Sequence, residues 1–209
     1  MTLDPLAVER DLVAYYDAED DRTDRPLDGR RVALRDAFLA DLSPGAAVLE
    51  IGPGPGRDTA AIAAAGHRVT AVELSFGHAG RCRAAVPDAA VVCASVRALP
   101  FDDGCFDALW SMSTLMHVPD NAIDGAIADI GRVLRAGAVA TIGVWSGPDV
   151  EEHSPMDAAR ARPARLFSRR SPSRWEELLG RIGDVRSSAV WEDDPADDFR
   201  YHVVTVVSG

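Results

Sequence analysis

The sequence is poor in cysteine. Its 209 residues contain only Cys82, Cys93 and Cys105, which are widely spaced and form no C-x-x-C pair. This pattern excludes a disulfide framework and is not that of a zinc site. We therefore expect reduced, structural thiols and no metal.

Long hydrophobic runs are also missing. No apolar stretch approaches the roughly 18 residues that a membrane-spanning helix needs. Residues 1–5 have neither the basic start nor the apolar core of a signal peptide. These features predict a cytoplasmic protein without a membrane partner.

Basic residues are too few to balance the acids: 22 arginines and lysines stand against 33 carboxylates, for a net charge of −11. A nucleic-acid binder normally presents a basic face, so we expect no nucleic-acid partner. The exception is a basic cluster in 160–174. Its members indicate either an acceptor with an acidic group or a solvated face that balances nearby acids: Arg160, Arg162, Arg165, Arg169, Arg170 and Arg174.

The most informative pattern lies in 46–73. Residues 46–51 form a short apolar run, typical of a buried parallel strand, and Gly52, Gly54 and Gly56 end it. An alanine-rich helix and a second strand follow. Glu73 ends that strand 21 residues after Gly52, where a carboxylate can accept from ribose hydroxyls. The pattern predicts a site for a nucleoside-containing cofactor.

The glycine spacing helps to separate two cofactor classes. Dinucleotide sites favour G-x-G-x-x-G, whereas this loop reads G-x-G-x-G with intervening prolines. The loop resembles the first motif of the class I S-adenosylmethionine-dependent methyltransferases. Residues 91–101, 106–111 and 132–137 resemble later segments of that family in the same order, and Leu-Pro-Phe at 99–101 is similar to a subgroup that mostly methylates small molecules.

The resemblance implies S-adenosylmethionine as cofactor and a set of residues that bind it. In the family, the Ser95 position is commonly Asp, which accepts from the adenine amino group, and exchanging a charged acceptor for a neutral one costs about tenfold in affinity. The family often covers the cofactor with a segment like Tyr-Tyr-Asp at 15–17. The implied binding residues are Glu50, Gly52, Gly54, Gly56, Glu73, Leu74, Ser95, Val96, Ser111 and Tyr16.

A general base is best sought after the fourth strand, in 111–119. His117 is the catalytic candidate, because a neutral imidazole can take a proton as methyl arrives; a packing role for this histidine stays open. His153, Glu151 and Glu152 are weaker alternatives, and positioning alone can supply much of the acceleration. Five residues are candidates for an apolar acceptor pocket: Trp110, Met112, Leu115, Met116 and Trp145.

The expected fold is α/β, a Rossmann-like doubly wound sheet of seven strands, mostly parallel with a C-terminal antiparallel hairpin. Strands are predicted at 46–51, 68–73, 89–93, 105–111, 138–145, 184–192 and 199–207. Helices are predicted at 5–17, 31–42, 57–65, 76–86, 121–134 and 173–181, with a charged, mobile stretch at 19–30. We expect one domain over 1–209: a helical cap (1–45), a cofactor-binding core (46–145), and a lid segment with the hairpin (146–209).

The sequence thus predicts methyl transfer from S-adenosylmethionine to a small-molecule acceptor, with oxygen slightly ahead of nitrogen or carbon, by a monomer or homodimer. Two alternatives stay open. One is a non-catalytic or non-methylating protein that binds S-adenosylmethionine, and the other is an NAD-dependent oxidoreductase.

Overall fold

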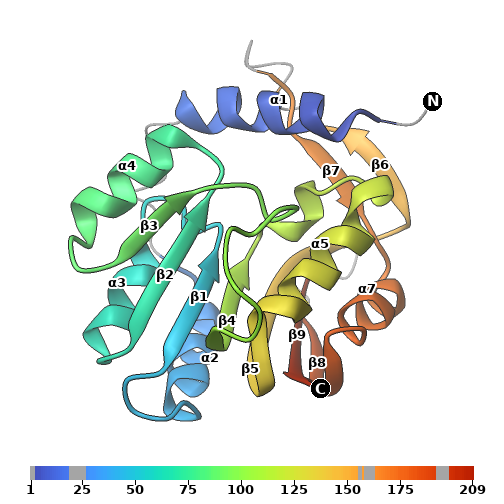
Figure 1. Cartoon of the computed structure of the whole chain (residues 1–209). Coiled ribbons are helices and arrows are strands. Elements are labelled where there is room, and N and C mark those ends of the chain that lie inside the picture. The colour runs from blue at the N-terminus through green and yellow to red at the C-terminus, as the bar shows by residue number, and fades with distance from the viewer. Residues whose placement is uncertain (1–2, 19–26, 155–156, 158–162, 192–197) are drawn as a thin grey trace.

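The computed structural model describes residues 3–18, 27–154, 157, 163–191 and 198–209 (Figure 1). A seven-stranded sheet has the order β3-β2-β1-β4-β5-β9-β8. Its strands are β1 (Ala47–Ile51), β2 (Arg68–Glu73), β3 (Ala90–Cys93), β4 (Phe106–Met112), β5 (Leu134–Ser146), β8 (Gly183–Trp191) and β9 (Arg200–Ser208). The first five run parallel, and β9 runs antiparallel to both β5 and β8. The predicted fold class, including the C-terminal hairpin, is confirmed.

Helices cover both faces of the sheet (Figure 1). The helices in the described residues are α1 (Pro5–Asp17), α2 (Gly29–Ala40), α3 (Arg57–Ala64), α4 (Phe76–Ala85), α5 (Asp120–Val133) and α7 (Pro172–Leu179), with a short 3₁₀ helix, η2 (Leu115–His117). The predicted helix and strand positions agree with these bounds to within a few residues.

Strand β1 shows why the chain forms two layers of core. Successive side chains of a strand point to opposite faces. Leu49 packs in the cluster that contains Ile127 of α5 and Trp175 of α7, whereas Val48 packs in the cluster that contains Ile62 of α3. Because β1 is buried on both faces, its run is apolar throughout except at Glu50.

Two features differ from the expectation. No strand is predicted within 147–171, but β6 (Val150–His153) and β7 (Leu166–Arg169) pair there as a separate antiparallel sheet. Strand β5 also begins earlier than predicted, at Leu134, because its pairing with β4 continues across an irregularity near Gly137, whose φ is +78°. Within the expected mobile stretch, residues 19–26 lie outside the described residues, as do Arg160 and Arg162 of the basic cluster.

Helix α1 lies across the carboxyl edge of the parallel strands (Figure 1). Its Val8 and Leu12 pack with Leu166 of β7 and with Leu74, which follows β2. The small β6–β7 sheet thereby supports the helix that covers this edge. Among the described helices, none is long and apolar enough to cross a membrane.

Candidate functional site

The glycine loop that joins β1 to α3 forms one wall of a pocket at the carboxyl edge. Gly52 and Gly54 lie on this wall with φ values of +73° and +57°, which side chains disfavour. A Cβ on Gly52 would lie 2.0 Å from Thr114 Oγ1, whereas a Cβ on Gly54 would meet nothing nearer than His78 Nδ1 at 4.0 Å. Close packing therefore requires the first glycine, and the second leaves its backbone open to the pocket.

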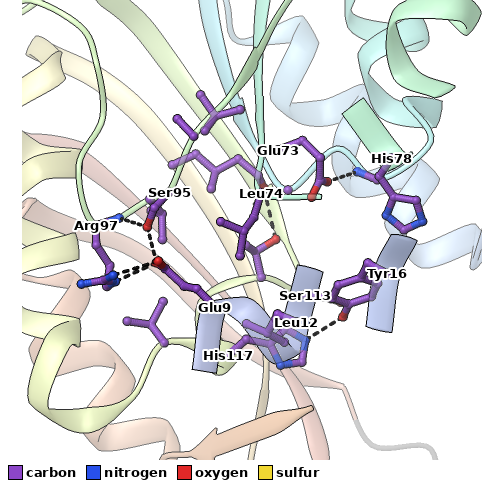
Figure 2. A pocket seen from close by; sticks show the side chains of 18 of the residues that line it. Glu9, Leu12, Tyr16, Glu73, Leu74, His78, Ser95, Arg97, Ser113 and His117 are labelled. Atoms are coloured by element: carbon purple, nitrogen blue, oxygen red, sulfur yellow. Dashed lines mark hydrogen bonds and ion pairs between the residues drawn. The ribbon is translucent and has the colours of Figure 1, made fainter. Parts of the chain in front are cut away.

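Glu73, whose side chain Figure 2 shows at the pocket, ends β2 and holds the glycine loop in place. Its Oε2 accepts from the Gly54 N–H at 3.0 Å, and its Oε1 accepts from the Ser75 N–H at 3.0 Å. The side chain is buried and lies on the pocket wall. Since an ionised carboxylate can accept about four hydrogen bonds, Glu73 can hold this loop and bind a ligand hydroxyl at the same time.

Helix α1 closes the pocket from above the sheet edge. Glu9, Leu12 and Tyr16 line the pocket from successive turns of one helix face (Figure 2). The end of α1 is fixed by Asp17, whose Oδ1 accepts from Ser75 Oγ at 2.5 Å. The helix is therefore tied to the turn between β2 and α4, where Glu73 accepts from the Ser75 N–H.

Glu9, Ser95 and Arg97 form a polar cluster at another part of the pocket wall. Ser95 Oγ donates to Glu9 Oε1 at 2.5 Å and accepts from the Arg97 N–H at 3.0 Å. The Arg97 guanidinium donates to both Glu9 oxygens, at 2.7 and 2.8 Å. Burial raises the pKa of Glu9, but the hydrogen bonds from Arg97 and Ser95 and the charge of Arg97 together bring this pKa below its usual value. Glu9 is thus a carboxylate at neutral pH.

His117 is held by both ring nitrogens. Its Nδ1 lies 2.7 Å from the Leu166 carbonyl oxygen, and its Nε2 lies 2.9 Å from the Tyr16 hydroxyl. A carbonyl only accepts, so Nδ1 carries the proton; in the neutral ring Nε2 then accepts from Tyr16. The basic nitrogen of His117 faces the pocket and is bonded to the hydroxyl of the covering helix.

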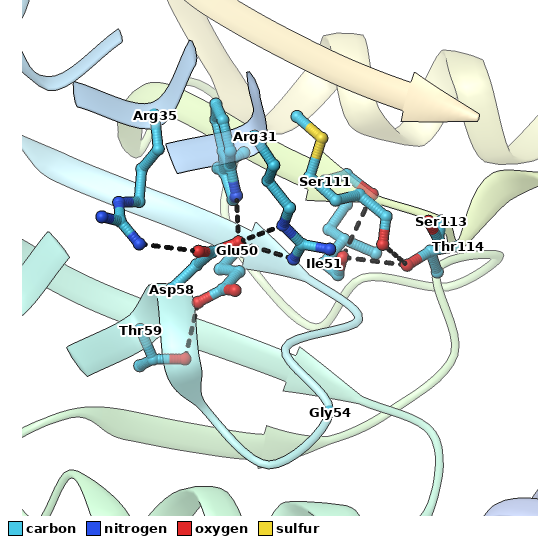
Figure 3. Close-up of polar contacts among 12 residues, drawn as sticks. Arg31, Arg35, Glu50, Ile51, Gly54, Asp58, Thr59, Ser111, Ser113 and Thr114 are labelled. Carbon is cyan, nitrogen blue, oxygen red and sulfur yellow. Dashed lines mark hydrogen bonds and ion pairs between the residues drawn. The ribbon is translucent and has the colours of Figure 1, made fainter. Parts of the chain in front are cut away.

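Glu50 lies beneath the glycine loop rather than on the pocket wall (Figure 3). It is buried and accepts from Thr59 Oγ1 at 2.6 Å. Burial raises the pKa of Glu50 to about 8, so the carboxyl is protonated at neutral pH. Nearby, the buried Asp58 accepts from Arg31 and from the Trp110 ring N–H. These groups support the loop from below.

A second pocket adjoins the first, and Tyr16, Ser113 and His117 line both. Its wall also carries four aromatic rings, those of Trp145, Phe167, Trp191 and Tyr201. Among the described residues that line it, the carboxylate is Asp28 and the arginines are Arg30, Arg31, Arg57 and Arg165. Asp28, Asp58 and Asp157 pair with Arg30, Arg31 and Arg165 respectively and balance part of this charge.

Most of the predicted binding residues lie on the first pocket. Those that line it are Gly52, Gly54, Glu73, Leu74, Ser95, Val96 and Tyr16, together with the catalytic candidate His117. Glu50, Gly56 and Ser111 lie behind the wall. Gly56 caps α3, and Ser111 Oγ donates to the Ile51 carbonyl at 3.0 Å.

The other candidates separate into two groups. Met116 and Trp145 line the second pocket and Met112 the first, whereas Trp110 and Leu115 are fully buried in the core. The weaker base candidates His153, Glu151 and Glu152 lie on β6 and line neither pocket.

The basic cluster is mostly structural where it is described. Arg170 is fully buried, binds the Val118 carbonyl at 2.9 Å and pairs with Asp120. Arg169 pairs with Glu152, and Arg174 pairs with Asp120. Of the described members, Arg165 alone lines the second pocket. The described arginines of the basic cluster therefore form ion pairs within the protein, and most of them do not line a pocket.

Sequence reasoning missed Glu9. The residue stands on the predicted helix 5–17, seven positions before Tyr16, so helical spacing places both on one face. Helical spacing thus indicates a shared face for Glu9 and Tyr16. Spacing alone does not show whether that helix face covers a pocket or packs on the core.

Comparisons with known proteins identify the family of this chain. Residues 49–142 match the family model described as "Methyltransferase domain". An uncharacterised methyltransferase of Synechocystis sp. is 31% identical over 150 residues, which are 71% of this chain and 68% of that protein. Two other curated relatives are much longer, and the chain spans 36% and 37% of their lengths.

Solved structures share the whole fold. The Burkholderia thailandensis 1,6-didemethyltoxoflavin-N1-methyltransferase, solved with 1,6-didemethyltoxoflavin and S-adenosylhomocysteine, is 26% identical with a TM-score of 0.74 over 100% of this chain and 92% of that chain. The [4+2]-cyclase SpnF is 16% identical with a TM-score of 0.71 over 91% of this chain and 84% of that chain, which shows the fold alone. The chain belongs to the class I S-adenosylmethionine-dependent methyltransferase family.

Proposed function

We propose that this chain binds S-adenosylmethionine in the first pocket and transfers its methyl group to a small molecule in the second. The observation that carries the proposal is that the two pockets meet at Tyr16, Ser113 and His117. A donor and an acceptor bound on either side of this boundary are close enough to react without crossing solvent.

The residues of the first pocket fit this cofactor. Gly54 has open space where a side chain would stand, so a ligand can approach its backbone. Glu73 supplies a carboxylate for the ribose hydroxyls, and Ser95 and Val96 line the pocket after β3, where the adenine would lie. Tyr16, on the covering helix, would shield the methionine end from water.

The second pocket fits a ring-containing acceptor. Aromatic side chains such as Trp145 and Trp191 offer flat apolar contact to a planar molecule. Four guanidinium groups line the described part of this pocket, three of them also paired with carboxylates, and their N–H donors support an acidic substituent on that molecule. An oxygen acceptor, a phenol or a carboxylic acid, suits this lining slightly better than nitrogen or carbon.

The bound sulfonium supplies an electrophilic methyl group, and the protein supplies position and a place for the acceptor's proton. His117 keeps its proton on Nδ1 against the Leu166 carbonyl, which leaves Nε2 as the basic atom at the boundary. The proton of an acceptor hydroxyl would pass to Nε2 directly or through the Tyr16 hydroxyl that is bonded to it. Side chains of the aromatic wall would hold the acceptor in line.

Calorimetry and a transfer assay test this proposal together. The purified protein is titrated with S-adenosylmethionine, S-adenosylhomocysteine and NAD, then incubated with methyl-tritiated S-adenosylmethionine and a panel of aromatic carboxylic acids, phenols and amines. We expect micromolar binding of the two sulfur compounds and label transfer to an aromatic acid or phenol. Binding without transfer to any acceptor would favour the non-methylating alternative, and binding of NAD alone would favour the oxidoreductase.

A further inference from the structure

One acidic side chain of the first pocket, Glu9, comes from helix α1 and not from the ends of the parallel strands. Figure 2 shows Glu9, Ser95 and Arg97 at one side of the pocket, with Glu73 and His78 at the other. Glu9 comes from α1, outside the core that carries the glycine loop, yet it lines the same pocket. The described lining of the pocket thus presents the Glu9 and Glu73 carboxylates at separate places.

Ser95 is poorly placed to accept a further hydrogen bond. Its hydroxyl proton is directed to Glu9 Oε1, and its oxygen already accepts from the Arg97 N–H. A hydroxyl oxygen has two lone pairs and no charge, so its remaining capacity is a single weak acceptor site. The sequence had identified Ser95 as the acceptor for the adenine amino group.

Glu9 is the better acceptor in this region. Its Oε1 accepts from Ser95 and from Arg97 Nε, whereas its Oε2 accepts from one Arg97 nitrogen. Each carboxylate oxygen can accept about two hydrogen bonds, so Oε2 has capacity for another donor. The Glu9 and Arg97 side chains are only 18% and 23% exposed, and in such partial burial a bond to an ionised acceptor is stronger than in water.

We propose that Glu9 accepts the hydrogen bond of the adenine amino group and thereby replaces Ser95 as the group that recognises the base. This inference rests on the proposed function, because it assumes an adenosyl cofactor in the first pocket. Arg97 and Ser95 then position Glu9 by holding its carboxylate against the pocket wall.

The assignment gives α1 a second role besides covering the pocket. Tyr16 and Glu9 stand two turns apart on one face of the helix, beside His117 and Ser95 respectively. With α1 in this position, Tyr16 lies at the boundary with the second pocket and Glu9 lies beside the proposed site of the base. A cofactor without the amino group would hold α1 less well.

The test compares two ligands that differ only at this amino group. S-adenosylhomocysteine and its 6-deamino purine analogue, which has hydrogen in place of the amino group, are titrated by calorimetry into the wild type and variants. We expect the wild type to prefer S-adenosylhomocysteine by about tenfold or more, and Glu9→Ala to bring the two affinities to within about twofold of each other. The ratio of the two ligand affinities is measured on one folded variant at a time, so a change in protein stability does not change this ratio.

Two further variants separate recognition of the base from the attachment of α1. Arg97→Met removes the ion pair that positions the Glu9 carboxylate, so its preference for the amino ligand should fall between those of the wild type and Glu9→Ala. Adding Ser95→Asp to Glu9→Ala should restore a preference of about tenfold. If Glu9→Ala does not fold, Glu9→Gln replaces it, and a preference at least threefold below the wild type is expected.

The outcomes are distinct. An unchanged preference in the Glu9 variant, or an equal loss of affinity for both ligands, would overturn the proposal and leave Glu9 as a latch for α1. Failure of the wild type to bind either ligand would instead overturn the proposed function.

Discussion

The two pockets meet at shared residues but are built from different parts of the chain. Backbone shapes the first: Gly52 and Gly54 form its wall, and Glu73 is held by two main-chain N–H groups. Side chains shape the second, with rings and guanidinium groups from α2, β5, β7, β8 and β9. A backbone wall suits one invariable ligand, whereas a wall of side chains can change its chemistry without altering the fold.

The largest expected effect is on the backbone-built pocket. Gly54→Val places a branched side chain in the open space at φ +57°, so we expect S-adenosylhomocysteine affinity to fall at least about a hundredfold by calorimetry. Gly45→Val is the matched control, because Gly45 also has positive φ (+72°) but lies outside both pockets. Equal binding by the two variants would contradict the assignment of the first pocket.

A substitution at the boundary between the two pockets should lower kcat more than cofactor affinity. His117→Ala removes the proton acceptor at the boundary, and we expect kcat to fall about a hundredfold while S-adenosylhomocysteine affinity changes less than threefold. His153→Ala, which changes an exposed residue of β6 that lines neither pocket, should leave both unchanged. Loss of thermal stability with turnover intact would assign His117 to packing.

A substitution in the second pocket should change the acceptor KM and leave cofactor affinity unchanged. Trp191→Ala removes a ring from the second pocket, where it also stacks with the Arg30 guanidinium. We expect the acceptor KM to rise about tenfold, in line with the loss of one aromatic contact. Cofactor affinity should not change, and a parallel loss of both affinities would show that the pockets are not separable.

A substitution of Glu50, which lies beneath the first pocket, should have the smallest effect on cofactor binding and should instead change the pH dependence of stability. Glu50 has a pKa of about 8 when folded and near 4.5 when exposed, so the folded protein holds the extra proton between these values. The stability that this proton contributes is present below about pH 4.5 and is lost as pH rises towards 8.

Glu50→Gln stays neutral at every pH and keeps an acceptor for Thr59. We expect denaturant melts to show the wild type losing up to about 1.4 kcal/mol per pH unit relative to this variant between pH 5 and 8. Cofactor affinity should change less than threefold, in keeping with a position behind the wall. Parallel stability curves for the two proteins would mean that Glu50 is not buried as a neutral acid.

The contrast between the pockets also explains what the sequence could predict. The first pocket depends on residues close together in the chain, such as the glycines at 52–56 and Glu73, whose spacing carries a backbone geometry. The doubly wound sheet followed from the same kind of local pattern. The second pocket gathers single side chains from distant elements, and no spacing links Arg31, Trp145 and Trp191.

Two local patterns were ambiguous for physical reasons. Strands β6 and β7 are short and carry charged residues, so their sequences do not predict a strand pair. In the structure, Leu166 of β7 packs against α1, which is a long-range contact. The arginine cluster at 160–174 suggested an anion site, but Arg170 is buried against Asp120, a partner 50 residues away in sequence. Long-range pairing of this kind leaves no local signature.

A crystal structure with bound S-adenosylhomocysteine would show directly which pocket holds the cofactor. We expect the ribose hydroxyls on Glu73, the adenine beside Ser95 and Glu9, and the sulfur directed towards Tyr16, His117 and the second pocket. A ligand bound in the reverse direction, or seated in the second pocket, would contradict the assignment of a backbone-built cofactor site beside a side-chain-built acceptor site.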